Sequence, residues 1–304
     1  MTLDPNALAE QLTRAAQTPV VENHPLSGEC SFRLGGRARY FCTPETPEAL
    51  RAVWLKAREL ALPVFILGGG SNVLFKDEGF AGVVIATKNL RQITATPAGA
   101  IRAYAGARNA DMTALTLDRG LTGFEWASGL PGSVGGGVYM NARCYGHSFS
   151  DIVTSVRVFT LEGQWLTLSA PECRFAYKDS VFQHEHFIIV EVELALAPGE
   201  PAAIRTRSEH TLADRQKRGQ FEFPSAGCVF KNAMAINQPA GKLIEDCGLK
   251  GLVKGGAQVY EKHANFIINS GTATTQDVTD LIGIIKTRVR EKHHFELEEE
   301  IKIV

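Results

Sequence analysis

Two glycine-rich loops constrain the fold and the chemistry of this chain more than any other feature. The first, GGGSNVLF at 68–75, follows a short apolar run, and the second, GLPGSVGGGVYMNA, occupies 129–142. Backbone N–H groups that are not screened by side chains can point inward at a pyrophosphate. A tight turn that needs positive φ would explain either loop alone. Two such loops in one chain predict a phosphate-bearing cofactor, most naturally a dinucleotide.

The spacing of the glycines excludes two common nucleotide-binding motifs. The first loop does not have the G-x-G-x-x-G pattern that opens a helix, and no Gly-Lys-Ser/Thr follows it. The residues expected to contact the cofactor are Gly68, Gly69, Gly70, Ser71, Asn72, Val73 and Leu74 in the first loop, and Pro131, Gly132, Ser133, Gly135, Gly136 and Asn141 in the second.

Composition bounds the class of protein. With 304 residues, 44% of them apolar and 21% charged, the chain is long enough for two or three domains with ordinary cores. A net charge of -1 gives no global attraction to nucleic acid or to an anionic membrane. The start lacks a basic region followed by an apolar one, and no apolar run is long enough to cross a bilayer, so we expect a cytoplasmic protein.

Cysteine and histidine spacing gives no sign of a metal site. The six cysteines are scattered without a C-x-x-C pair, and the eight histidines form neither H-x-x-x-H nor H-E-x-x-H. We therefore expect free, mostly buried thiols and no bound metal.

The pattern of apolar residues indicates alternating helices and strands. Segment 46–61 predicts a helix that Thr46 caps and Pro47 begins, followed by a strand at 63–67. Strands are also expected at 83–86 and 101–106, and a helix from Asn109 to a terminal Gly120. Two strands, 152–160 and 164–169, flank a tight turn, and 187–196 is a third. Residues 197–203 are expected to form a linker, with a domain boundary near 199–203.

The last hundred residues predict a smaller α+β unit. We expect a basic helix ending near Arg218, a short helix within 238–249 closed by Gly248, and strands at 257–260 and 265–269. A long amphipathic helix at 275–292 and a final strand at 295–304 complete it. Helices packed on one side of a small sheet is the natural arrangement.

Motifs along nearly the whole chain resemble one family, the UDP-N-acetylenolpyruvoylglucosamine reductases of the MurB type. The similar stretches are FRLGG at 32–36, ILGGGSNVLF at 66–75, 125–142, CRFAYKDSVF at 173–182, PSAGCVFKN at 224–232, AGKLIEDCGLKG at 240–251, 255–269 and LEEEI at 297–301. The connection 232–238 is short, which is typical of the compact class that lacks the mobile tyrosine loop of the long class.

This resemblance implies a fold and an activity. The fold is α+β: a two-part FAD-binding domain of the vanillyl-alcohol-oxidase/PCMH type, with subdomains 1–88 and 89–200, and a C-terminal α/β substrate-binding domain, 201–304. NADPH reduces the FAD, which passes a hydride to the vinyl carbon of UDP-N-acetylglucosamine enolpyruvate to give UDP-N-acetylmuramate for peptidoglycan. No nucleic acid, membrane or obligate protein partner is expected.

The resemblance also implies three catalytic residues, and the sequence departs from the family at two of them. Lys178 stands where the family has arginine, and supplies charge to an enolate without the planar bidentate fork. Cys228 stands where the family has serine as proton donor. A thiol is a stronger acid than an alcohol and can deliver the proton, but it ionises at alkaline pH.

The third catalytic residue is a glutamate of the final strand. Strand alternation singles out Glu299, an acid on the same face as Leu297 and Ile301. The family's L-E-P-E pattern instead aligns the catalytic acid with Glu300, and we follow the alignment. Without it, a solvated acidic edge strand would be the simpler interpretation.

The expected substrate contacts lie near these residues. They are Tyr177, Arg218, Lys231, Asn232 and His263, of which the cations would form a local positive site for the UDP diphosphate.

Two other functions compete with the reductase. One is a different flavin oxidase or dehydrogenase on the same FAD scaffold, which the C-terminal motifs at 224–232 and 240–251 disfavour. The other is a flavin-binding protein that has lost catalysis, for which the changes at 178 and 228 are the support.

Overall fold

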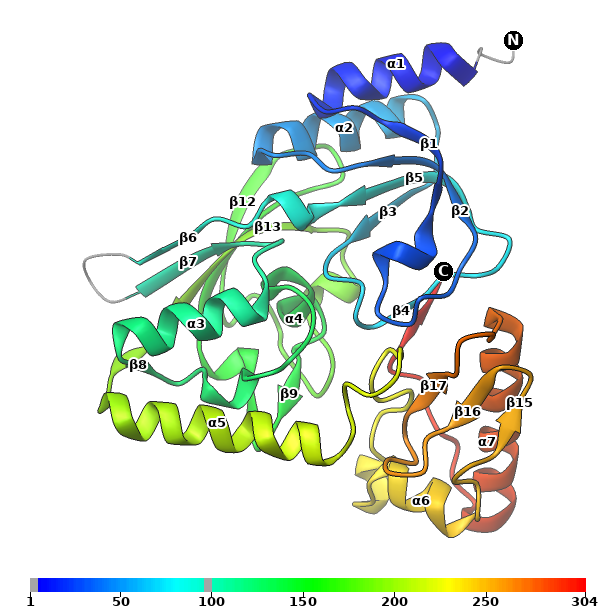
Figure 1. Ribbon diagram of the computed structural model, residues 1–304. Coiled ribbons are helices and arrows are strands. Elements are labelled where there is room, and N and C mark those ends of the chain that lie inside the picture. The colour runs from blue at the N-terminus through cyan, green and yellow to red at the C-terminus, as the bar shows by residue number, and fades with distance from the viewer. Residues whose placement is uncertain (1–4, 96–99) are drawn as a thin grey trace. The chain divides into compact units, whose positions relative to one another are not determined.

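The computed structural model describes residues 5–95 and 100–304 (Figure 1). Its contacts divide the chain into two compact units, each built from separate segments. The first unit comprises 1–23, 39–69 and 81–213, and the second comprises 24–38, 70–80 and 214–304. The three-part division into 1–88, 89–200 and 201–304 stays a prediction.

A four-stranded sheet and two helices form one half of the first unit. The strand order is β1-β2-β5-β3, and β3 pairs in parallel with β5. Buried side chains of α1, α2, β2 and β5 share one core, and partly buried side chains of β3 pack against it. Their bounds are α1 Pro5–Ala16, β1 Val21–Pro25, β2 Arg37–Cys42, α2 Pro47–Glu59, β3 Val64–Leu67 and β5 Phe80–Ala86.

Local chemistry explains the limits of the helices in this unit. Thr46 Oγ1 accepts a hydrogen bond from the Ala49 N–H at 3.1 Å, and Pro47 is the first residue of α2, as the sequence predicts. The helix α3, Asn109–Arg119, ends at Gly120, whose φ of 62° is the left-handed conformation that favours glycine.

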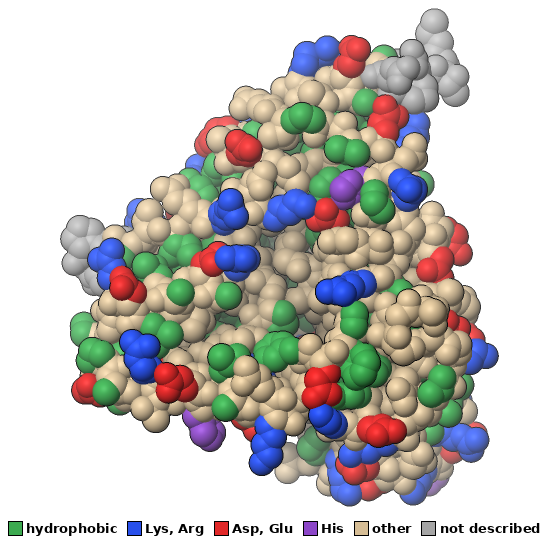
Figure 2. Space-filling model, in the orientation of Figure 1, with side chains coloured by type: hydrophobic (Ala, Val, Ile, Leu, Met, Phe, Trp, Pro, Cys, Tyr) green, Lys and Arg blue, Asp and Glu red, His purple; other side chains and the backbone are tan. Residues whose placement is uncertain are grey.

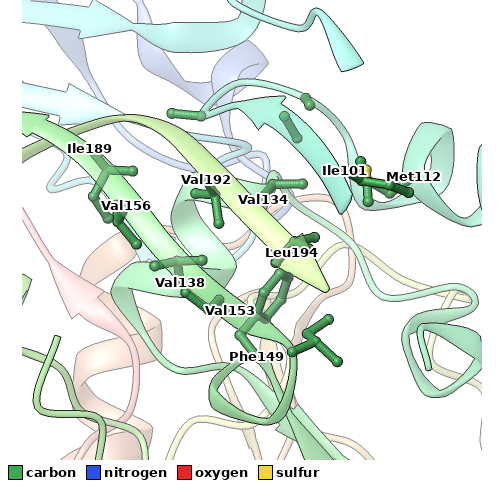
Figure 3. Packing of buried hydrophobic residues seen from close by; sticks show 14 of the residues in the cluster. Ile101, Met112, Val134, Val138, Phe149, Val153, Val156, Ile189, Val192 and Leu194 are labelled. Atoms are coloured by element: carbon green, nitrogen blue, oxygen red, sulfur yellow. The ribbon is translucent and has the colours of Figure 1, made fainter. Parts of the chain in front are cut away.

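An antiparallel five-stranded sheet forms the other half of the first unit, in the order β12-β11-β13-β7-β6. The expected hairpin is confirmed, with Val156 opposite Leu168. Val134 and Val138 of the short helix α4 lie among buried side chains of β11 and β13 (Figure 3). The bounds are β6 Ile93–Ala95, β7 Ala100–Tyr104, β8 Leu121–Thr122, α4 Val134–Tyr139, β9 Arg143–Cys144, β10 His147–Ser148, β11 Val153–Phe159, β12 Trp165–Ser169 and β13 Ile188–Ala195.

The expected linker at 197–203 is instead ordered secondary structure. The short strand β14, Ala197–Pro198, pairs with β8, and α5 begins at Pro201 and runs to Lys217. The Glu200 carboxylate accepts hydrogen bonds from the Ala202 and Ala203 N–H groups, which would otherwise lack partners at a helix start. A glutamate inside a Pro- and Gly-rich stretch thus caps a helix.

The second unit contains a three-stranded antiparallel sheet, β15-β16-β17, with α6 and α7. Asp77 accepts from the Thr275 N–H and, with Thr274, caps the start of α7. The bounds are β4 Val73–Leu74, α6 Ala240–Asp246, β15 Val253–Lys254, β16 Ala257–Val259, β17 Ile267–Asn269, α7 Thr275–His293 and β18 Lys302–Ile303.

The final segment is less regular than the sequence predicts. Only Lys302 and Ile303 form a ladder, in parallel with Val73 and Leu74 of β4. Glu299 makes an isolated bridge with Phe230. The expected strand at 295–304 is therefore divided between two partners that lie far apart in the sequence.

The described residues also bear on membrane-spanning helices, metal sites, disulfide bonds and surface charge. In the described ranges, no helix is both long and apolar enough to cross a membrane. No group of three or more histidine, cysteine or acidic side chains in that part of the chain could hold a metal ion. In the described ranges none of the six cysteines forms a disulfide bond, and three are buried and three half-buried. Among the described side chains on the face in Figure 2, acidic and basic groups are interspersed.

Candidate active site

The two glycine loops meet inside the first unit. A Cβ added to Gly69 would lie 2.5 Å from the Cα of Gly132 and 2.8 Å from the nitrogen of Ser133. A Cβ on Gly68 would lie 2.8 Å from Ser133 Oγ. Only glycine permits main chain to approach main chain this closely. The predicted pair of loops is therefore one structural element.

The second loop rests on a buried asparagine and a helix cap. Asn109 donates from its main chain to Gly132 O and from Nδ2 to Pro131 O, at 3.1 and 3.2 Å. Ser133 Oγ accepts from the Gly136 N–H and caps α4. Asn109 is 1% exposed, and its Oδ1 has no hydrogen-bond partner among the described residues. A buried acceptor beside this loop is thus available to a ligand.

Asn141, another expected cofactor contact, is engaged within the protein. Its Nδ2 donates to Ala176 O at 2.8 Å, and its Oδ1 accepts from the Ser150 N–H at 3.0 Å. These two bonds use both ends of the side-chain amide and tie the second loop to the segment that precedes Lys178.

The rest of the first loop belongs to the second unit. Gly70 has a φ of 64°, and a Cβ there would lie 2.1 Å from the carbonyl oxygen of Glu29. Val73 and Leu74 are ladder-bonded to β18, and Leu74 is fully buried. The Nδ2 of Asn72 donates to the carbonyl oxygen of Glu300 at 3.0 Å. The loop is therefore joined to the segment that carries the glutamates.

Cys228 and Glu300 lie on neighbouring segments of the second unit. Cys228 bridges Phe266 on one side. The next residue, Val229, accepts from the Glu300 N–H at 2.7 Å on the other side. The half-buried Cys228 packs against a small cluster that contains Tyr260 and Phe266. Main-chain pairing thus brings together two of the three expected catalytic residues.

The three adjacent glutamates have different environments. Glu299, which strand alternation singled out, receives the Lys286 ammonium of α7 at 3.0 Å. Glu298 is exposed and pairs with Lys231 at 2.5 Å. Glu300 has its main chain bonded to Val229 and Asn72. The unusual acid in the apolar pattern is therefore accounted for by an ion pair with a helix.

Lys178 lies in the first unit, at the tip of a two-residue turn. Ala176 and Asp179 exchange main-chain hydrogen bonds at 3.0 and 3.3 Å. Lys178 has a φ of 55°, which is uncommon for a residue with a side chain, and Gln183 Nε2 donates to its carbonyl oxygen at 3.0 Å. A strained backbone held by its surroundings is frequent at functional sites.

The cations expected at the diphosphate already have acidic partners. Lys231 pairs with Glu298, and Arg218 pairs with Asp214 at 2.8 Å. Asn232 Oδ1 accepts from the Ala240 N–H at the start of α6. These residues therefore have structural contacts besides any substrate role, and their role as substrate contacts stays a prediction.

His263 does not add a positive charge at neutral pH. Burial, together with the charges of Arg218 and Lys250, lowers its pKa below the ordinary value. Its ring lies 4.4 Å from that of Phe266, centre to centre, and its Nδ1 has no hydrogen-bond partner among the described residues. The imidazole can offer a hydrogen bond to a ligand, but it adds no charge to the positive site expected for the diphosphate.

Two residues that support the site were missed at the sequence level. Asn265 exchanges hydrogen bonds with both main-chain groups of Phe230 through its side-chain amide, at 2.8 and 2.9 Å. Ser31 donates from Oγ to Ser225 O at 2.6 Å and from its main chain to Gly70 O at 3.0 Å. Asn265 lies within the motif 255–269, where an asparagine beside apolar residues indicates a buried polar contact. Ser31 gave no signal of its own.

Two family models match separate parts of this chain. Residues 38–169 match the family model of an FAD binding domain, and 219–304 match that of the UDP-N-acetylenolpyruvoylglucosamine reductase C-terminal domain. The α+β fold expected from the sequence is confirmed by these two matches.

Full-length relatives carry the same name. The reductase of Carboxydothermus hydrogenoformans is 38% identical over 302 residues, which cover 99% of each chain. That of Geobacillus kaustophilus is 39% identical over 285 residues, covering 94% of this chain and 93% of the relative. The crystal structure of the Thermus caldophilus enzyme has a TM-score of 0.78 at 32% identity, and covers 93% of this chain and 97% of that one. Identity at this level over nearly the whole length shows that the chain belongs to the UDP-N-acetylenolpyruvoylglucosamine reductase family, a family of oxidoreductases, and that it carries an FAD binding domain.

Proposed function

We propose that this protein reduces UDP-N-acetylglucosamine enolpyruvate to UDP-N-acetylmuramate, a precursor of peptidoglycan, with FAD bound and NADPH as reductant. The observation that carries the proposal is the main-chain pairing between Val229 and Glu300. It places a thiol and a carboxyl group on adjoining segments of the domain that matches the reductase C-terminal model. An enolate is protonated at its α-carbon, and this step needs a proton donor and a group that stabilises the enolate oxygen.

The residues of the first unit fit a dinucleotide. The Gly69–Gly132 approach leaves main chain without side chains at the meeting of the two loops. The buried Asn109 Oδ1 beside it fits a ligand that brings a hydrogen-bond donor. These residues, with Gly68 and Ser133, would hold the FAD. When bound, FAD supplies the hydride that is transferred to the enolpyruvyl group.

Three residues, two of them in the second unit, would stabilise the enolate and protonate it. Cys228 Sγ donates a proton to the carbon next to the one that receives the hydride, because a thiol is acidic enough to do so near neutral pH. Glu300 stabilises the enolate that forms when the hydride is transferred. Lys178 supplies a positive charge to the same anion.

A half-reaction experiment separates the three competing functions. Bound flavin is reduced anaerobically with NADPH, and the UDP-enolpyruvyl sugar is then added while the flavin absorbance is followed. Bleaching followed by rapid recovery is expected of the reductase. Bleaching without recovery would identify a different flavin oxidoreductase, and no bleaching would identify a flavin-binding protein without this chemistry.

A matched pair of variants tests the assignment of the glutamate. Glu300→Gln and Glu299→Gln make the same change on adjacent residues, but Glu299 is paired with Lys286. We expect Glu300→Gln to slow recovery of the flavin by about 10²-fold or more, because a carboxamide is a far weaker acid than a carboxyl group and stabilises the enolate less. Glu299→Gln should cost only about 0–1 kcal/mol of stability, because that ion pair is partly exposed to solvent. Equal effects of the two substitutions would contradict the assignment.

A further inference from the structure

The main chain of Glu300 is held from two sides by different parts of the second unit. Its N–H donates to Val229 O at 2.7 Å. Its carbonyl oxygen accepts from Asn72 Nδ2 at 3.0 Å, and the Lys302 N–H donates to Asn72 O at 2.9 Å. One residue of the glycine loop thus contacts the chain on both sides of Ile301, and it does so through its side chain as well as its main chain.

The side chain of Asn72 extends a ladder that the main chain cannot continue. Val73 and Leu74 pair in parallel with Lys302 and Ile303, and the Val304 N–H donates to Leu74 O at 3.0 Å. N-terminal to Val73 the main chain turns into the glycine loop. The carboxamide has the same donor group as a peptide bond, so it supplies the next hydrogen bond at the position where the ladder ends.

The hydrogen bond from Asn72 to Glu300 lies between segments whose neighbouring residues are buried. Leu74 is fully buried and Ile301 is 4% exposed, so the segments on each side of the bond are fixed by packing. Val229 is also fully buried. Glu300 itself is half-buried, and its main chain is bonded to Val229 on one side and to the Asn72 side chain on the other.

We propose that Asn72 is a positioning residue for the carboxyl group of Glu300. The amide holds the main chain of Glu300 at the segment that carries Cys228, and so sets where the carboxyl group lies during protonation. This inference rests on the proposed role of Glu300. It also gives the Asn72 side chain a task other than the cofactor contact that the sequence predicts, because its Nδ2 is bonded to protein.

The test separates the two half-reactions in the flavin-loaded enzyme. Asn72→Ala removes the donor, and Asn72→Asp keeps the shape while replacing the NH₂ group by an acceptor. We expect NADPH to reduce the flavin at the wild-type rate, and the UDP-enolpyruvyl sugar to reoxidise it about 10- to 100-fold more slowly, because a displacement of about 1 Å in a reacting group can cost ~10²-fold. The loss should fall on kcat more than on KM, and bound-flavin absorbance per protein should be unchanged.

Asn89→Ala is the matched control. Asn89 is an exposed asparagine whose Nδ2 also donates to a main-chain carbonyl, that of Thr43 at 3.3 Å, in the first unit. It should leave both half-reactions unchanged. If the Asn72 variants lose flavin in proportion to activity, the side chain holds the cofactor and the positioning role is wrong. Wild-type reoxidation in Asn72→Asp would also refute it.

A double-mutant cycle with Glu300→Gln completes the test. If Asn72 acts through Glu300, then adding Asn72→Ala to Glu300→Gln should slow reoxidation by less than about twofold further. Independent, multiplying effects would overturn the positioning role and leave the proposed function intact. If Glu300→Gln alone turns over normally, the proposed role of Glu300 fails, and the role of Asn72 fails with it.

Discussion

Replacing Gly69 with alanine tests whether the two glycine loops must touch. A Cβ at this position would lie 2.5 Å from Gly132 Cα, 2.7 Å from Gly132 C and 2.8 Å from Ser133 N. All three are main-chain atoms, and Asn109 and the cap of α4 hold them in place. No side chain can rotate away to relieve the overlap, so the loops themselves must separate.

The size of the effect follows from these distances. Carbon atoms in contact lie about 3.5–4.0 Å apart, so the loops must separate by roughly 1 Å. Overpacking of this kind costs about 1–3 kcal/mol. For a domain of 150–250 residues, 1 kcal/mol lowers the unfolding midpoint by about 2–4 °C, which gives a fall of roughly 2–12 °C. If these loops hold FAD, its affinity should fall as well.

The assay is thermal unfolding with and without FAD, together with FAD binding followed by flavin fluorescence. Gly283→Ala is the control: Gly283 lies inside α7, and an added Cβ would meet no atom within 4 Å. It should raise stability by about 0.5–1 kcal/mol, because alanine is the better helix former. Wild-type stability and wild-type FAD affinity in Gly69→Ala would refute the role of close approach.

Three further predictions concern separate groups. Because the folded protein lowers the pKa of His263, the unfolded chain binds the proton first; stability should be complete above about pH 6.5 and fall as the pH drops below it. His263→Asn should flatten the dependence of urea midpoints on pH. Arg207→Ala should cost about 1–2 kcal/mol in chemical unfolding, because it removes the cation beside Glu125, which is 8% exposed but keeps hydrogen bonds from Thr122 and Gly123. Cys228→Ser should extend activity to higher pH, since an alcohol does not ionise where a thiol does, and this is read from kcat against pH.

The predictions for Arg207 and Cys228 each have a control on the same part of the chain. Arg205→Ala, at an exposed position of α5, should change stability by less than about 0.5 kcal/mol. Cys247→Ser changes a half-buried thiol elsewhere in the second unit and should leave the alkaline limb as it is. An alkaline limb that Cys228→Ser does not move would count against the thiol as proton donor. A pH dependence unchanged in His263→Asn would remove that histidine from the linkage.

Elements with local signals could be predicted from the sequence. Thr46 and Pro47 indicate the start of α2, and Gly120 indicates the end of α3. Such signals can be predicted because a capping residue or a terminal glycine affects only the backbone within a few residues of it. The meeting of the two glycine loops could be predicted in kind but not in detail. Which glycine faces which main-chain atom depends on how Asn109 and α4 support the second loop.

Interactions between distant segments could not be predicted. Strand alternation identified Glu299 as an acid on the apolar face of the final segment. Only the fold shows that Glu299 forms an ion pair with Lys286 of α7. The same limit applies to Lys231. The sequence indicates a cation that could bind a diphosphate, whereas in the fold Lys231 forms an ion pair with Glu298. His263 is a similar case, since burial decides its charge. In each instance the partner is set by tertiary packing, which a local pattern does not encode.

The pairing of β4 with β18 has a consequence for how the protein folds. The Asn72–Glu300 contact joins residues 228 positions apart in the chain. Because long-range pairings pay the entropy of closing a large loop before they are rewarded, the second unit should be the slower of the two to form. On the ribosome, β4 is made long before its partner. Its unpaired edge would have to wait through the synthesis of residues 81–213 of the first unit and most of the second, which makes this strand a natural place for transient misassociation during biosynthesis.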